Sequence, residues 1–136
     1  LVAALSLYLC LLLPVFSQEA YYWTYSQHLD LSYYDHPPMV AWLMWLGTAM
    51  FGDGALGIRA GTWLCGLGTT WLGLKFLRDY GVGSVGQRIW VLMGIGVPAF
   101  AVARVLANPD APLVFFVTAA TYAIHRARHG WCSCQW

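Results

Sequence analysis

Four apolar segments with almost no charge run through this chain of 136 residues, and they limit what it can fold into. Charged residues make up 10% of the chain and hydrophobic residues 60%. Soluble domains carry roughly 25% charged and about 45–50% apolar residues, so this chain has too little polar surface to cover a core in water. It also has eight Trp and eight Tyr, residues that concentrate at membrane interfaces. The sequence therefore predicts an integral membrane protein.

The fold class that we expect is all-α, a polytopic transmembrane helix bundle with about four spans. A helix needs about 20 residues to cross a hydrocarbon core about 30 Å thick. The expected segments are residues 1–16 for span 1, 17–55 for an outer loop, 56–77 for span 2, 88–106 for span 3 and 110–126 for span 4. The charge-free runs are short, which is typical of helices whose polar flanks face a protein interior.

The distribution of charge predicts the orientation. The basic residues that follow the second span or end the fourth are Lys75, Arg78, Arg88, Arg126 and Arg128. The positive-inside rule places them in the cytoplasm. Five of the six carboxylates lie in the two other connections, which then face outward: Glu19, Asp30, Asp35, Asp53 and Asp110. The chain has no run of basic residues that could follow a phosphate backbone, so we expect no nucleic-acid partner.

The outer loop is too apolar to be a solvated connection. An aromatic stretch from Glu19 to His28 predicts a short helix at the membrane interface. Pro37-Pro38 then opens a second helix from Met39 to about Phe51, because Pro suits the first helical turn. Two interfacial helices of this kind would form a platform over the bundle.

Three of the outward carboxylates stand in settings that could support chemistry: Glu19, Asp35 and Asp110. Such groups can act as a general base or hold a cation. Each setting also has a structural interpretation. Asn108 is a good N-cap residue, and a carboxylate in the first turn of a helix complements the helix dipole. The residues alone leave both interpretations open.

Three longer strings resemble one known superfamily. They are Gln18-Glu-Ala-Tyr-Tyr-Trp23, the run Gln27-His-Leu-Asp-Leu-Ser-Tyr-Tyr-Asp-His-Pro-Pro-Met-Val-Ala-Trp42, and Asn108-Pro-Asp-Ala-Pro-Leu-Val-Phe-Phe116. They are similar to the GT-C membrane glycosyltransferases of the dolichyl-phosphate-mannose protein mannosyltransferase type. This superfamily includes RgtA/B/C/D-like enzymes and the lipid A aminoarabinose transferases. The resemblance covers nearly the whole chain to about residue 128.

The resemblance implies a glycosyltransferase that moves a sugar from a polyprenyl-phosphate carrier to a hydroxyl group of a lipid, glycan or protein acceptor. Residues 1–136 would be the N-terminal part of one transmembrane glycosyltransferase domain. The protein would lie among membrane lipids, as a multi-pass protein of the bacterial inner membrane with its site facing the periplasm or exterior. A segment of this size is expected to be inactive by itself.

The resemblance also suggests roles for individual residues. The family usually has Asp-Glu where this chain has Gln18-Glu19, so the catalytic residues expected are Glu19 and Asp110. Asp35 matches a position that binds a divalent metal cation in some relatives. The residues expected to bind substrate are Gln18, Tyr34, His36 and Arg59. Arg59 and Arg104 lie toward the outer ends of their spans, and each could hold the leaving phosphate or pair with Asp53 or Asp110.

Two other classes of protein compete with this interpretation. The first is a transporter or channel segment, because Gly94, Gly96 and Pro98 could mark a broken helix. The second is a catalytically inactive structural relative, because Gln18 replaces the usual acid. Release of sugar from a labelled polyprenyl-phosphate donor would support only the enzyme.

Overall fold

The computed structural model describes residues 2–97 and 105–132, and within these ranges the regular structure is helical without strands. The helices are α1 (Val2–Leu12), α2 (Ser17–Gln27), α3 (Met39–Phe51), α4 (Ala55–Asp79), α5 (Ser84–Gly96) and α7 (Asp110–Cys132). The expected all-α class is therefore confirmed for this part of the chain.

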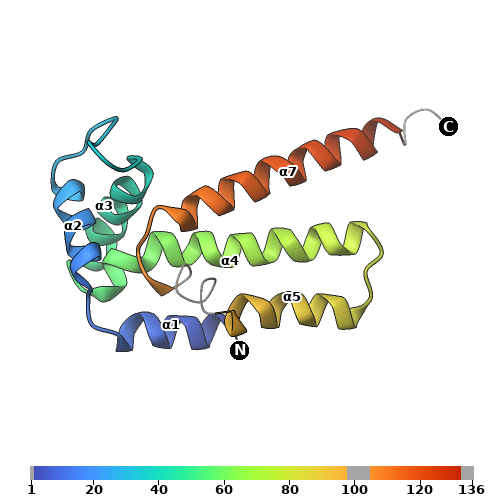
Figure 1. Ribbon diagram of the computed structural model, residues 1–136, viewed down its shortest axis with the longest axis horizontal. Helices are drawn as coiled ribbons and strands as arrows, with labels where there is room; N and C mark the ends of the chain where they lie inside the picture. Colours follow the sequence, from blue (N-terminus) through green and yellow to red (C-terminus); the bar gives the residue numbers. More distant parts are fainter. Residues whose placement is uncertain (1, 98–104, 133–136) are drawn as a thin grey trace.

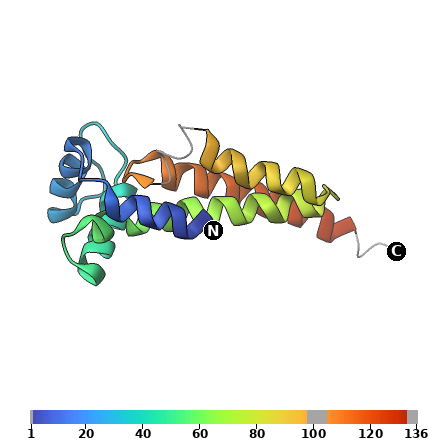
Figure 2. The ribbon, with the colours of Figure 1, turned by 90° about the horizontal axis from the view of Figure 1, so that it is seen from below.

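Helices α5 and α7 run along α4, and the outer-loop helices α2 and α3 lie together at one end of them (Figure 1). Helix α4 lies centrally and packs against α1, α3, α5 and α7. Helices α2 and α3 lie across the end of the bundle at which α4 and α7 begin, and the view turned by 90° shows the same arrangement (Figure 2). The two helices expected in the outer loop are thus present, and α3 has the expected limits.

A sharp corner separates α1 from α2. The axes of Ala3–Leu12 and Ser17–Gln27 differ by 89°. Pro14 stands in this corner and disfavours helical geometry at the residue before it, which ends α1. Considered by length and apolarity, none of the described helices could cross a membrane alone, while α1 and α2 together meet that criterion as a bent pair.

Helices α3 and α4 approach each other so closely that glycine is required between them. A Cβ atom added to Gly47 would lie 2.1 Å from the carbonyl oxygen of Gly57. One added to Gly61 would lie 2.7 Å from the Cβ atom of Leu43. Small residues allow such backbone contact between helices, and this contact fixes α3 on the first turns of α4.

A small apolar core lies where α2, α3, α4 and the segment before α7 meet. Its buried members are Tyr22, Val40, Met44, Ile58 and Ala107. The core joins the outer-loop helices α2 and α3 to α4 and to the segment before α7.

Candidate functional site

A buried ion pair between Arg59 and Glu19 lies at the corner between α1 and α2. The Arg59 side chain is 0% exposed. Its Nε and one terminal nitrogen donate hydrogen bonds to the two carboxylate oxygens of Glu19, over 2.7 and 2.6 Å. The remaining N–H groups donate to the backbone carbonyl oxygens of Cys10, Leu13 and Pro14, over 2.6, 2.9 and 2.7 Å. A guanidinium has five N–H donors, so every donor of Arg59 is in use.

The Glu19 carboxylate is as fully engaged as its partner. It is 2% exposed and also accepts hydrogen bonds from the backbone N–H groups of Phe16 (3.0 Å) and Ala107 (2.8 Å). Burial alone would raise the pKa of this carboxyl group. The hydrogen bonds from Arg59, Ala107 and Phe16 outweigh burial and hold the pKa below its ordinary value.

This geometry bears on two of the roles expected from the sequence. Glu19 is expected as a catalytic base, but a carboxylate with a lowered pKa and four internal donors is poorly suited to take a proton from a substrate. Arg59 is expected to bind substrate, but it has no donor left for a phosphate. The alternative pairing of Arg59 with Asp53 or Asp110 is wrong, because its partner is Glu19. Asp53 instead accepts a hydrogen bond from the indole of Trp23 over 3.2 Å.

Asp35 lies beside two tyrosines of α2. Its two carboxylate oxygens accept hydrogen bonds from the hydroxyl groups of Tyr25 (2.7 Å) and Tyr21 (3.0 Å). The imidazole Nε2 of His36 lies 3.6 Å from the same carboxylate. The Tyr25 bond in the first place, then the Tyr21 bond and the charge of His36, hold the pKa of Asp35 below its ordinary value. A hydrogen bond with the Tyr21 hydroxyl, and then the bond to Asp35, raise the pKa of Tyr25.

A series of polar contacts leads from Asp35 and His36 into the core. The side-chain amide of Gln18 donates to the Tyr22 hydroxyl over 3.0 Å, and that hydroxyl lies 3.3 Å from His36 Nε2. Tyr22 is completely buried and packs edge-to-face against the His36 ring. Gln18 and His36 are therefore brought together through Tyr22, whereas the side chain of Tyr34 is fully exposed.

A divalent cation at Asp35 would find few ligands. His36 is the other ligating side chain beside it, and both oxygens of Asp35 already accept hydrogen bonds from tyrosine. Over residues 2–97 and 105–132 no group of three or more His, Cys, Asp or Glu side chains is placed to hold a metal ion. The residues present therefore do not make a good cation site.

Asp110 differs from the other two carboxylates. It begins α7, where its N–H group and that of Ala111 donate to the side-chain oxygen of Asn108, over 3.0 and 3.1 Å. The predicted N-cap at Asn108 is therefore confirmed. The Asp110 residue is exposed. In the part of the chain that the structure describes, its carboxylate has no hydrogen-bond or ion-pair partner.

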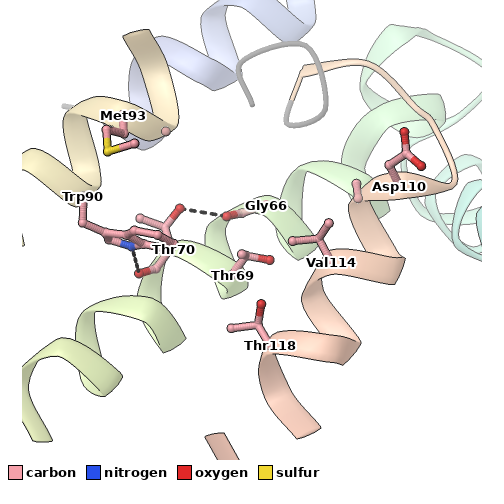
Figure 3. A pocket seen from close by; sticks show the side chains of 10 residues that line it. Gly66, Thr69, Thr70, Trp90, Met93, Asp110, Val114 and Thr118 are labelled. Atoms are coloured by element: carbon pink, nitrogen blue, oxygen red, sulfur yellow. Dashed lines mark hydrogen bonds between the residues drawn. The ribbon is translucent and has the colours of Figure 1, made fainter. Parts of the chain in front are cut away.

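Asp110 stands at one end of an apolar cavity between α4, α5 and α7 (Figure 3). The cavity measures about 140 Å³. The lining residues besides Asp110 are Gly66, Thr69, Thr70, Trp90, Met93, Gly94, Ala111, Val114 and Thr118. The sequence did not predict this cavity. The small residues of α4 were a usable signal for it, since glycine and threonine leave room between helices.

The three carboxylates do not converge on this cavity. Asp110 belongs to its wall, but Glu19 and Asp35 do not. Glu19 still touches the segment that leads to Asp110, through the N–H group of Ala107. Arg104, which the sequence suggests as a further cation near the outer face, lies outside the described residues.

Comparisons with known proteins agree with this picture. The family described as dolichyl-phosphate-mannose-protein mannosyltransferase matches residues 35–130. The lipid A galacturonosyltransferase RgtD of Rhizobium johnstonii is 34% identical over 112 residues, which make up 79% of this chain and 23% of that relative. The chain thus spans about a quarter of the length of the curated relative. No solved structure matches it. Because the family match covers most of the chain, from the Asp35-His36-Pro37-Pro38 string through α7, the chain belongs to the dolichyl-phosphate-mannose-protein mannosyltransferase family, a group of GT-C membrane glycosyltransferases.

Proposed function

We propose that this chain forms part of an enzyme that transfers a sugar from a polyprenyl-phosphate carrier to a hydroxyl group of a lipid, glycan or protein acceptor. The observation that carries the proposal is Asp110, an exposed carboxylate without a partner among the described residues, at the end of an apolar cavity. A free carboxylate supplies a base, and an apolar cavity suits part of a prenyl chain.

The reaction that we propose is a direct displacement with inversion at the anomeric carbon. Asp110 takes the proton from the acceptor hydroxyl while that oxygen forms a bond to the anomeric carbon. The bond between this carbon and the phosphate oxygen breaks, and the lipid phosphate leaves with the electron pair. Of the two carboxylates expected to be catalytic, Glu19 accepts four hydrogen bonds from internal donors, whereas the Asp110 carboxylate accepts none from the described residues.

The leaving phosphate needs positive charge or hydrogen-bond donors. Arg59 has none to spare, because its five N–H groups are bound within the protein. His36, held between Tyr22 and Asp35, is the side chain at this end of the molecule that we assign to the phosphate as a hydrogen-bond donor. Further cations would come from parts of the enzyme that correspond to the rest of the relatives' length.

We also propose a polytopic bundle in a bacterial inner membrane, with α2 and α3 at its periplasmic surface. The right angle between α1 and α2 supports this arrangement, because a helix across the end of a bundle lies in the plane of the membrane. The separation of acidic and basic residues supports the orientation.

The test is an assay of sugar transfer in membrane vesicles with a labelled polyprenyl-phosphate donor. It uses a polypeptide of the relatives' length that carries these residues, beside residues 1–136 alone. We expect turnover by the long form and none by the short form.

Asp110→Asn should lower kcat of the long form by about 100-fold, the usual order for loss of a general base, while the control Asp53→Asn keeps its rate. Turnover that survives Asp110→Asn would exclude Asp110 as the base. No turnover by the unaltered long form would favour an inactive relative or a transporter segment.

A further inference from the structure

We propose that Glu19 and Arg59 are positioning residues that hold the backbone leading into Asp110. This assignment rests on the proposed function in one respect, which is the role of Asp110 as the base. It differs from the expectation that Glu19 takes a proton and that Arg59 binds substrate.

The first link is between Glu19 and the segment that precedes α7. Glu19 Oε1 accepts the N–H group of Ala107 over 2.8 Å, and Ala107 is buried. Two residues earlier, the carbonyl oxygen of Val105 accepts a hydrogen bond from the thiol of Cys10 over 3.3 Å. The short segment 105–107 is therefore fastened to α1 and to the start of α2, far from it in the sequence.

The second link runs from Ala107 to Asp110. Asn108 caps α7 by accepting the N–H groups of Asp110 and Ala111. Between these anchors stands Pro109, whose ring fixes φ near −65°. With the Ala107 amide held at one end and the cap closed at the other, little freedom remains for the backbone that carries the Asp110 carboxylate.

The third link is Arg59, which holds Glu19 in place. Its other three hydrogen bonds go to carbonyl oxygens at the end of α1, so the same guanidinium closes the corner between α1 and α2. A lysine keeps the charge but has three donors instead of a planar fork of five. One arginine on α4 thus joins the end of α1, the start of α2 and, through Glu19, the entry to α7.

Two measurements test the assignment on the long form described above. The first is hydrogen exchange at the amides of residues 105–111, which requires no activity. We expect loss of protection there in Glu19→Gln and Arg59→Lys, while the exposed control Asp53→Asn leaves exchange unchanged. Cys10→Ala keeps the ion pair and should loosen residues 105–107 to a smaller degree, so it carries the measurement if the other variants do not fold.

The second measurement separates kcat from KM for sugar transfer. Misplacement of a reacting group by about 1 Å can cost about 100-fold in rate. We expect kcat to fall by about that factor in Arg59→Lys, with KM for the donor within about twofold of the unaltered value. A rise in KM with kcat unchanged would overturn the assignment and make Arg59 a substrate-binding residue.

The exchange measurement can overturn the positioning role separately from the proposed function. Unchanged exchange at residues 105–111 in both Glu19→Gln and Arg59→Lys would overturn the positioning role, whatever the activity. Loss of protection in a protein without any transferase activity would uphold the coupling and count against the proposed function alone.

Discussion

At the scale of single residues, Arg59 is a buried charge whose donors are all hydrogen-bonded within the protein. Removing a charged group from water is expensive unless every donor finds an acceptor. Here the acceptors come from the carbonyl groups left over where α1 ends and from Glu19. The sequence indicated that Arg59 needs a partner, but it suggested Asp53 or Asp110. Glu19 is 40 residues away, and only the corner at Pro14 brings it close.

The lowered pKa of Glu19 makes the stability of the fold depend on pH. A carboxyl group whose pKa is lower in the folded state stabilises the fold above its unfolded pKa, about 4.3 for Glu, and loses that contribution as the pH falls towards the folded value. Asp35, with a lowered pKa as well, acts in the same direction. We therefore expect the free energy of unfolding to be nearly constant from pH 7 to about pH 5 and to fall at lower pH.

Unfolding by denaturant in mild detergent, followed by Trp fluorescence between pH 3 and pH 7, measures this dependence. Asp35→Asn removes the contribution of Asp35 and isolates that of Glu19. Glu19→Gln should be less stable at neutral pH and should flatten the curve. An equally steep loss of stability below pH 5 in Glu19→Gln would show that other groups cause it.

At the scale of helices, local signals were sufficient where a proline or an N-cap residue marks the start of a helix. Pro37-Pro38 before Met39 predicts the start of α3. The helix ends before Gly52, which has the positive φ of 79° that favours glycine. Asn108 likewise predicts the start of α7. The approach of α3 to α4 could not be predicted, because nothing local shows which glycines meet across two helices.

This contact gives a prediction at the same scale. Gly47→Ala places a Cβ atom against the carbonyl oxygen of Gly57, and neither backbone can yield without separating α3 from α4. We expect the free energy of unfolding to fall by about 1–3 kcal/mol, the usual cost of overpacking. The measurement is unfolding by denaturant at pH 7.

The control is Gly96→Ala, where a Cβ atom meets nothing within 4 Å. Alanine favours a helix over glycine by up to about 1 kcal/mol, so this variant should be as stable as the original chain or more so. Equal stability of the two variants would mean that α3 and α4 are not held in backbone contact.

At the scale of the whole molecule, most acidic side chains lie at one end and most basic side chains at the other. Glu19, Asp35 and Asp110 belong to the end formed by α2, α3 and the start of α7, while Lys75 and Arg78 lie where α4 ends. Arg59, buried against Glu19, and Asp79, the last residue of α4, are exceptions. This division could be predicted from the sequence, because the charged residues of each segment between two helices are neighbours in the chain. The cavity could not be predicted, because three helices form its wall.

The division predicts opposite exposure of the two ends in a membrane. Single cysteines are introduced at Ser32, between α2 and α3, and at Ser84, at the start of α5, in a chain whose own cysteines are replaced by serine. An impermeant thiol reagent added outside intact cells should label position 32, and position 84 should react only after the membrane is opened. Labelling of both positions from the same side contradicts the proposed topology.

Because Arg59 on α4 binds the corner between α1 and α2, that corner can reach its final structure only after α4 has been synthesised. Cys10, Leu13, Pro14 and Glu19 leave the ribosome 40 to 49 residues before Arg59, whose side chain binds all of them. Until α4 has been made, those carbonyl groups and that carboxylate depend on water or on lipid headgroups at the membrane surface. The first two helices are therefore not an independent folding unit, and their final geometry is set only after the chain has returned through α4.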